Sequence, residues 1–392
     1  MMERPVEERK RLYFLDNLRV ALTILVIAHH VGQAYGPTGG SWPIQEPARA
    51  AVLGPFFTVN RSFFMSLFFL ISGYLMVMSY DRSRPGAFIK SRLLRLGVPL
   101  VLFFILVIPL EQYLCHWRGD DLGGMGFWRY YTQHYFGAGV RPADWKGPAW
   151  PEMNFGHLWY VEHLLIVSLC YAALRLVWQR PEGTAPMVAK PLRHWAIVVF
   201  ALVLAVASGT IRIWYPIDRW IGFLGFIQVA FADVPRDLSF FILGAIAYRR
   251  GWFLNVSKDM GRVWLLIGVT LAALWYAFSL GNLWSAFHIS RETRGFIYPF
   301  WEALLCCGIC IGSLVLFRER LNYQGWLGKR LAENQYAAYL FHVPVVIFVQ
   351  YFVAGIALLP FTKFALVTAV SIPLTFLLSA AVRAPAPVRR VL

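Results

Sequence analysis

The chain has 392 residues, of which 58% are apolar and 15% charged, and its mean hydropathy is +0.54. This composition excludes an ordinary soluble protein, because no soluble core of this size could bury so much apolar surface. The 37 Lys and Arg residues against 21 Asp and Glu residues give a net charge of +16, which indicates either a nucleic-acid partner or the basic inner loops of a membrane protein.

Ten apolar stretches are long enough to cross a bilayer, at about 20 residues each. They begin near residues 18, 57, 96, 158, 195, 237, 263, 296, 336 and 359. The sequence therefore predicts an all-α, polytopic membrane protein with about ten transmembrane helices, folded as a single domain over 1–392. Charged residues interrupt the apolar run before the sixth span, so we place that span at about 235–249. The preceding segment, 213–234, is expected to be extracytoplasmic and partly interfacial.

The distribution of positive charge orients these spans. With residues 1–17 in the cytoplasm, the inner segments hold 24 of the 37 Lys and Arg residues. This asymmetry predicts both termini inside, with a cytoplasmic tail over 383–392, and makes a nucleic-acid partner unnecessary. The basic head and the apolar run at 20–28 also resemble a secretory signal. Its cleavage would leave nine spans and invert the charge pattern, so we expect the segment to be retained.

The first span carries ionisable residues at membrane depth, where such groups are functional candidates. Arg19 and His30 are eleven helical steps apart, so they share one face with a rise of about 16 Å between them. An anionic ligand held by Arg19 at the cytoplasmic mouth could then reach His30 as a base. His29 points about 100° away, and we therefore favour His30. In the structural alternative, Arg19 snorkels and the histidines bond neighbouring helices.

Spans two and three each contain a short motif. Ser72-Gly73 either allows close helix packing or places a hydroxyl near a substrate. Arg92 and Arg95 share a helical face and can clamp one phosphate group, although a positive-inside signal would also explain them.

The longest predicted loop, 115–156, is extracytoplasmic and rich in aromatic residues, including Trp145. Its rings either form an interfacial belt or stack on sugar faces. His157 and Trp159 follow it at the outer mouth of span four, where we expect them to contact a substrate. Glu162, inside span four, either orients a histidine or pairs with an arginine of a neighbouring span.

Two later spans contain further polar candidates. Cys306, Cys307 and Cys310 share one span, and we expect them to pack between helices, so no metal site is predicted. His342 is expected near the inner end of the span that begins near residue 336. It precedes Pro344, which frees backbone carbonyls, so His342 either bonds one of these carbonyls or contacts a bound ligand.

Five segments in sequence resemble the acyltransferase-3 family of integral membrane acyltransferases. They are LDNLRVALTILVIAHH, FFLISGYLM, KSRLLRLGVP, GHLWYVEHLLI and QYAAYLFHVPV. ISGYL, the HLW span and DLSFFILGAIAYRRGW are also similar to the glucan succinyltransferase branch. The resemblance implies an inner-membrane enzyme that transfers an acetyl or succinyl group from cytoplasmic acyl-CoA to a hydroxyl of a carbohydrate or other exported acceptor. It maps the Arg-x10-His pair onto Arg19 and His30, and the Arg-x-x-Arg pair, implicated in acyl-CoA binding, onto Arg92 and Arg95.

The residues support this chemistry independently of the family resemblance. A thioester is already activated, so the enzyme needs a base for the hydroxyl and positive charge for the phosphates of CoA, with no permanently bound cofactor. We expect His30 to be the base and Arg92 and Arg95 to hold phosphate, with Arg19 and His342 also contacting CoA. Since no residues follow Leu392, the membrane domain is expected to bind the acceptor itself.

Two other classes compete with this hypothesis. A proton-coupled transporter or exporter would use the buried His and Arg residues, but the sequence has no second copy of the Arg19–His30 pattern. A membrane receptor or scaffold fits the hydropathy but leaves the basic residues clustered at one mouth unexplained. Under all three hypotheses the protein lies in a membrane and contacts membrane lipids.

Overall fold

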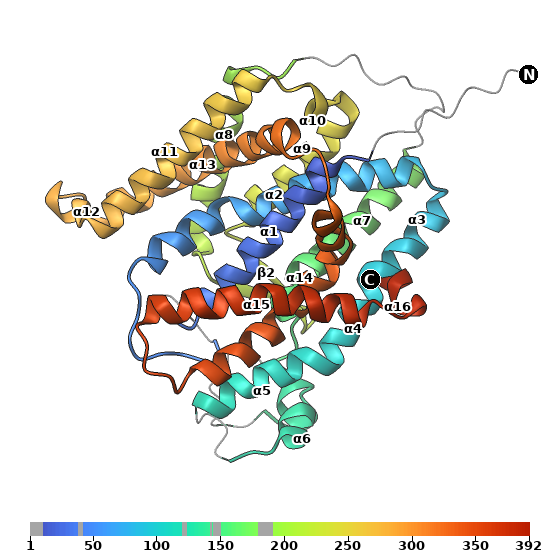
Figure 1. The fold of residues 1–392 in the computed structure, drawn as a ribbon, viewed down its shortest axis with the longest axis vertical. Coiled ribbons are helices and arrows are strands. Elements are labelled where there is room, and N and C mark those ends of the chain that lie inside the picture. Colours follow the sequence, from blue (N-terminus) through green and yellow to red (C-terminus); the bar gives the residue numbers. More distant parts are fainter. Residues whose placement is uncertain (1–10, 38–41, 120–123, 142, 144–149, 179–190) are drawn as a thin grey trace, which may run out of the picture.

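The computed structural model describes residues 11–37, 42–119, 124–141, 143, 150–178 and 191–392, and its helices pack side by side into one bundle (Figure 1). Within these ranges, nine helical segments are long and apolar enough to cross a membrane. Seven are single helices: α1 (Tyr13–Gly32), α2 (Leu53–Asp81), α8 (His194–Trp214), α11 (Lys258–Leu280), α13 (Arg291–Arg320), α14 (Trp326–Val353) and α15 (Pro360–Val382). The eighth, Gly156–Val177, joins one short 3₁₀ turn to α7 (Trp159–Val177). The prediction of an all-α, polytopic membrane protein is confirmed.

The ninth segment, Pro85–His116, is built from several helical pieces. These are α3 (Pro85–Arg92), the π-helical turn η1 (Leu93–Gly97), α4 (Val98–Leu102), a second π-helical turn η2 (Phe103–Val107) and α5 (Ile108–Gly119). Short elements complete the chain: α6 (Phe127–Arg129), η3 (Tyr130–Tyr135), η4 (Gly156–Leu158), α10 (Trp252–Asn255), α12 (Leu283–Ala286) and α16 (Ala386–Val391).

The sixth predicted span corresponds to α9 (Val234–Arg250). This helix has 17 residues, fewer than any of the nine segments above, and it carries charged side chains near both ends. The tenth crossing, and with it the cytoplasmic position of both termini, stays a prediction.

The segment before α9 contains a small β-hairpin. β1 (Trp220–Phe223) pairs antiparallel with β2 (Ile227–Ala230), and Trp220 lies opposite Ala230. The turn between them uses Leu224 and Gly225 at positive φ, the conformation that suits a tight hairpin. These are the only strands in the part of the chain that the structure describes.

Two glycines allow α2 and α9 to pack closely. A Cβ atom on Gly73 would lie 2.1 Å from the carbonyl oxygen of Phe241, and one on Gly244 would lie 2.0 Å from that of Leu70. Small residues of this kind let helix backbones approach each other within a membrane. Close packing therefore accounts for Gly73, whereas Ser72 lies on a different surface.

Two prolines inside helices free carbonyl groups that side chains from other elements then bond. Pro99 has no N–H for the carbonyl of Arg95, which accepts a hydrogen bond from Tyr336 Oη at 2.7 Å. In the same way Pro344 frees the carbonyl of Leu340, which accepts from His157 Nε2 at 2.9 Å.

The start of α14 corrects the prediction for His342. The helix begins at Trp326, about ten residues before the predicted span, and continues through Pro344 to Val353. Its first turns carry Lys329 and Arg330, which lowered the hydropathy of that stretch without preventing a helix. His342 therefore lies in the middle of a continuous helix rather than near its inner end.

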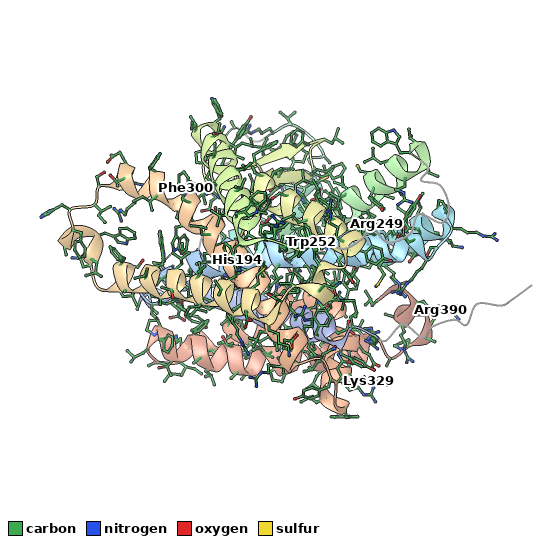
Figure 2. The ribbon with its side chains drawn as sticks, turned by 90° about the horizontal axis from the view of Figure 1, so that it is seen from above. His194, Arg249, Trp252, Phe300, Lys329 and Arg390 are labelled. Carbon is green, nitrogen blue, oxygen red and sulfur yellow. The ribbon has the colours of Figure 1, made fainter. Side chains whose placement is uncertain are left out.

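The side-chain view shows how charge is distributed along the bundle. Arg249, Lys329 and Arg390 lie on the right of the molecule in Figure 2, and Phe300 lies on the left. The three basic residues belong to segments predicted to face the cytoplasm. We call this the inner end of the bundle and the opposite end the outer end.

Candidate functional site

Two cavities meet at Tyr339, which lines both of them. The outer cavity has a volume of about 500 Å³ and contains His30, whereas the inner cavity has about 340 Å³ and contains Arg19. The rings of Phe68, Tyr160 and Tyr339 pack together between them, with centroids 5.6 to 6.2 Å apart. We call these three residues the aromatic layer.

The inner cavity gathers the predicted arginines. Arg19 from α1, Arg92 from α3 and Arg95 from η1 all line it, together with Arg383, which follows α15. Among the described residues that line it, Glu333 is the one side chain with a carboxylate. Four guanidinium groups against one side-chain carboxylate make this cavity suited to a ligand with several negative charges.

Two details of the inner cavity refine its chemistry. Arg92 Nε is buried and has no hydrogen-bond partner among the described residues, and the guanidinium carbon lies 4.9 Å from the centroid of the Phe88 ring. Ser72 also lines the cavity, and its Oγ lies 2.6 Å from Tyr160 Oη, which connects it to the aromatic layer. The sequence did not single out Arg383, because an arginine after the last span looks like an ordinary tail charge.

Three histidines from different elements form a cluster beside the outer cavity. His30 of α1 and His342 of α14 have ring centroids 4.8 Å apart, and His342 and His157 of η4 have centroids 5.1 Å apart. His30 Nδ1 lies 3.3 Å from His342 Nε2. The structure thus places His342 with His30, and His342 does not line the inner cavity.

Hydrogen-bond partners assign the proton positions in this cluster. His342 Nδ1 lies 2.6 Å from the carbonyl of Tyr339, so it donates, and Nε2 of the neutral ring accepts. His30 Nδ1 lies 2.9 Å from the carbonyl of Val26 and therefore donates to it, with His342 Nε2 as a second acceptor. This leaves Nε2 of His30 with a free lone pair, as a general base requires.

Glu111 joins this cluster and is a residue that sequence reasoning missed. Its Oε2 lies 3.4 Å from His157 Nδ1, and the Glu111 side chain is nearly buried. The sequence showed only that Glu111 places a carboxylate in the apolar run of span three. Nothing in the sequence indicates that α5 brings it to His157.

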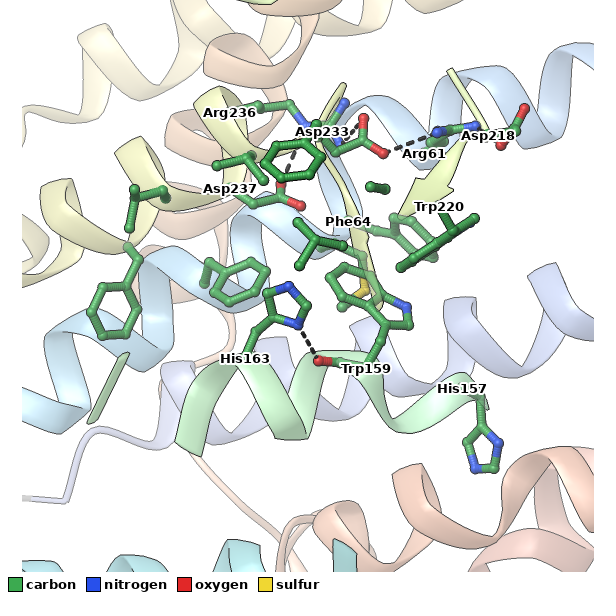
Figure 3. Close-up of a pocket in the computed structure, with 18 of the residues that line it drawn as sticks. Arg61, Phe64, His157, Trp159, His163, Asp218, Trp220, Asp233, Arg236 and Asp237 are labelled. Carbon is green, nitrogen blue, oxygen red and sulfur yellow. Dashed lines mark hydrogen bonds and ion pairs between the residues drawn. The ribbon is translucent and has the colours of Figure 1, made fainter. Parts of the chain in front are cut away.

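The outer cavity combines aromatic and charged walls, as Figure 3 shows. His157 and Trp159 line it, and the ring centroids of Trp159 and Trp220 of the hairpin lie 5.7 Å apart. His29 also lines this cavity, but its ring packs 5.0 Å from those of Phe57 and Phe64 and makes no part of the His30–His342 contact.

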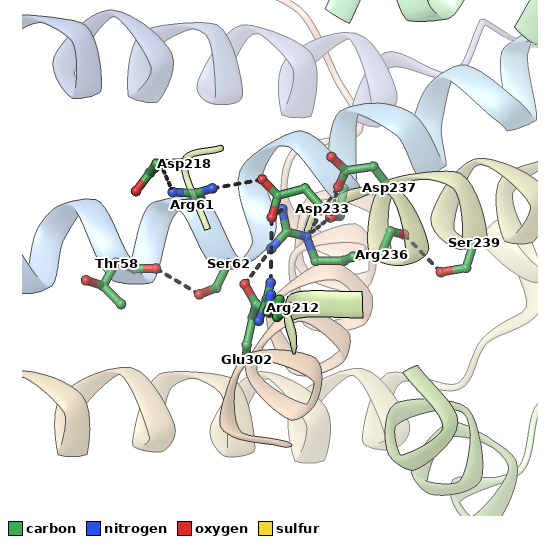
Figure 4. A network of polar contacts seen from close by, with 11 residues as sticks. Thr58, Arg61, Ser62, Arg212, Asp218, Asp233, Arg236, Asp237, Ser239 and Glu302 are labelled. Carbon is green, nitrogen blue, oxygen red and sulfur yellow. Dashed lines mark hydrogen bonds and ion pairs between the residues drawn. The ribbon is translucent and has the colours of Figure 1, made fainter. Parts of the chain in front are cut away.

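A network of buried ion pairs forms the wall behind this cavity (Figure 4). Arg236 of α9 contacts Glu302 of α13 at 2.5 Å and Asp233 at 3.1 Å, and Arg212 of α8 contacts Glu302 at 2.8 Å. Arg61 of α2 contacts Asp233 at 2.9 Å. Buried charges of this kind require partners, so the network fixes four helices around the cavity. In the sequence it was visible only as the charges that interrupt the sixth span.

Glu162 lies apart from the two cavities. It is buried in α7, it lines neither cavity, and its carboxylate lies 3.7 Å from His163 Nδ1. The structure therefore does not bring it together with His30. Among the described residues no group of three or more His, Cys, Asp or Glu side chains is arranged to hold a metal ion.

The aromatic loop packs on itself and on η2, where Tyr131 Oη donates to the carbonyl of Ile105 and Tyr135 Oη to that of Phe104. Tyr130 Oη donates to Glu152 Oε2 at 2.6 Å, and His116 Nε2 lies 2.8 Å from Glu152 Oε1. None of the residues described between 115 and 156 lines the outer cavity, and Trp145 lies outside the described residues. Trp128 is 74% exposed, as an interfacial ring would be.

Comparisons with known proteins relate the chain to proteins named for glucan biosynthesis. It is 28% identical over 248 residues to glucans biosynthesis protein C of Escherichia coli K12 and of Shigella dysenteriae serotype 1 strain Sd197. The matched region covers 61% of this chain and 58% of each relative. No solved structure matches the chain. The acyltransferase-3 family, described as an acyltransferase domain, matches residues 12–380, and the chain belongs to this family.

Proposed function

We propose that the protein is an O-acyltransferase of the inner membrane, which transfers an acetyl or succinyl group from cytoplasmic acyl-CoA to a hydroxyl of a carbohydrate. One observation carries the proposal. A cavity rich in arginine and a cavity with a base-competent histidine meet at Tyr339, so a long anionic donor bound in one could present its reactive end in the other.

The donor would bind from the inner end. The phosphate groups of CoA would pair with Arg92 and Arg95, and Arg19 would extend this clamp toward the pantetheine arm. The arm would then pass the aromatic layer toward His30, eleven residues further along α1 and about 16 Å higher.

The transfer itself needs two proton movements, one onto His30 and one off it. His30 Nε2 takes the proton of the acceptor hydroxyl while the hydroxyl oxygen attacks the thioester carbonyl. A carbon–oxygen bond forms, the carbon–sulfur bond breaks, and CoA leaves as the thiolate. The proton on His30 then passes to the thiolate or to water, which returns the histidine to its starting state.

The neighbouring histidines act as positioning residues in this scheme. His342 accepts from His30 Nδ1, which keeps the lone pair on Nε2 and holds the ring in place. His157 packs against His342, and Glu111 lies on the other side of His157, with its Oε2 3.4 Å from Nδ1. The chain of contacts stabilises the imidazolium that forms on His30 during transfer.

The outer cavity suits a carbohydrate acceptor. Sugar rings bind through apolar C–H faces and polar hydroxyls, and here Trp159 and Trp220 provide aromatic faces while Asp218 and Asp233 provide hydrogen-bond acceptors. The relatives named for glucan biosynthesis favour the same class of acceptor.

CoA binding to the purified protein tests the donor site. Replacing Arg92 or Arg95 by Gln should weaken CoA binding about tenfold to 100-fold, as expected for the loss of a charge-assisted hydrogen bond. Arg84, exposed just before α3 and outside both cavities, is the matched control, and Arg84→Gln should bind CoA like wild type.

Transfer of label from radioactive acetyl-CoA or succinyl-CoA tests the base. His30→Ala should lower the rate by about 10²- to 10⁴-fold and leave CoA binding unchanged. If His30→Ala transfers label like wild type, or if no acyl-CoA binds, the proposed function is wrong and a transporter becomes the better hypothesis.

A further inference from the structure

An apolar groove runs between α7 and α9 on the side of the bundle, apart from the inner cavity. Its volume is about 680 Å³. Its walls include Cys170 and Leu174 of α7 and Ile242 and Ile246 of α9. Leu174 is 51% exposed and Ile242 is 49% exposed. In a bilayer these side chains face lipid, so the groove opens sideways into the membrane.

The inner end of the groove is basic. Arg175, Arg249 and Arg250 line it, and Arg249 lies at the inner end of the bundle in Figure 2. Asp81 pairs with Arg249 at 2.5 and 2.9 Å and lies 3.6 Å from Arg175. Among the described residues Arg250 forms no ion pair; its guanidinium lies 6.0 Å from the ring of Trp252. Three guanidinium groups against one carboxylate leave an excess of two positive charges.

We propose that this groove binds one anionic phospholipid of the inner leaflet, with an acyl chain between α7 and α9 and its phosphate at Arg250 and Arg175. The apolar walls match the chain, and the excess charge matches a headgroup with net negative charge, which a zwitterionic lipid lacks. Basic pockets between helices at the cytoplasmic surface bind anionic headgroups for this reason. A soluble phosphate compound would gain nothing from the apolar walls.

The position of the groove gives the lipid a structural consequence. Val167, Leu238 and Phe241 line both the groove and the outer cavity. An acyl chain in the groove therefore packs against the outside of the wall that encloses the outer cavity. Phe241 also meets Gly73 across the α2–α9 contact, so this wall belongs to the packed core of the bundle.

A fluorescence experiment tests the proposal at the groove itself. Cys170 is exposed in the groove, whereas Cys306, Cys307 and Cys310 are buried and Cys115 is partly buried. Bimane attached to Cys170 in the full-length protein can report contact with brominated acyl chains in vesicles. At about fivefold per excess charge, brominated phosphatidylglycerol in a phosphatidylcholine background should quench at on the order of 30-fold lower mole fraction than brominated phosphatidylcholine.

Arginine variants assign this preference to the basic end. Arg250→Gln should reduce the preference for phosphatidylglycerol about fivefold, and Arg250→Lys, which keeps the charge, should retain it. Arg262→Gln is the matched control, because Arg262 is an exposed arginine near the inner end of α11 and does not line the groove.

Three results would overturn the proposal. Equal quenching by the two brominated lipids would show that the groove does not select charge. An unchanged preference in Arg250→Gln would move the binding elsewhere. Loss of the preference on addition of inorganic phosphate, but not of sodium chloride at the same ionic strength, would show that the arginines bind a free anion instead of a lipid.

Discussion

The close contact between α2 and α9 makes Gly73→Ala a severe test of the packing. The added Cβ would lie 2.1 Å from the carbonyl oxygen of Phe241, which is more than 1 Å inside van der Waals contact. Because the neighbour is backbone, no side-chain rotation relieves the clash, and the two helices must separate. Overpacking of this kind costs about 1–3 kcal/mol. We expect Gly73→Ala to lower the unfolding temperature of the purified protein.

Gly295→Ala provides the control for that experiment. Gly295 also lies in a long helix, α13, but a Cβ atom there meets nothing within 4 Å. Since Ala favours a helix over Gly by about 0.5–1 kcal/mol, this variant should be as stable as wild type or slightly more stable. Equal unfolding temperatures for Gly73→Ala and Gly295→Ala would refute the close backbone contact.

Three further variants probe the site. His342→Leu removes one of two acceptors for His30 Nδ1, so transfer should slow only about threefold to tenfold with an unchanged KM for acyl-CoA; a loss as large as that of His30→Ala would contradict a positioning role. Trp220→Ala should raise the KM for a carbohydrate acceptor about threefold to tenfold, measured by label transfer, and an unchanged KM would remove the stacking role. Glu302→Gln should destabilise the protein by about 1–3 kcal/mol in thermal unfolding, because Arg212 and Arg236 lose one charged partner while Arg236 keeps Asp233; wild-type stability would mean that this contact is dispensable.

Hydropathy predicted most of the fold, because burial in lipid requires apolar runs of fixed length. Hydropathy failed in segments where charged residues lie within or directly beside a membrane-spanning helix. The start of α14 was predicted too late, because Lys329 and Arg330 lower the hydropathy of its first turns. Charged residues do not prevent a helix from extending beyond the apolar run. The hairpin at 220–230 was not predicted. The sequence indicated only a partly interfacial segment there, and the turn depends on positive φ at Leu224.

The site was predictable only where its residues share one element. Arg19 and His30 lie on one helix, so their spacing alone predicted that they share a face of that helix. Arg92 and Arg95 follow the same logic across one turn. Glu111 and His342 come from helices far apart in the sequence, and no periodicity predicts which spans lie beside each other. Their contact with the other histidines depends on tertiary packing, including the carbonyl that Pro344 leaves free for His157.

Tyr339 connects the two halves of the proposed reaction. It lines both cavities, its ring forms part of the aromatic layer, and its hydroxyl donates to the carbonyl of His157 at 3.0 Å. Its own carbonyl accepts from His342. A donor arm that passes the layer must displace this ring or slide along it, and either movement acts on residues that orient His30. In the proposed reaction, therefore, arrival of the thioester and alignment of the base depend on the same side chain.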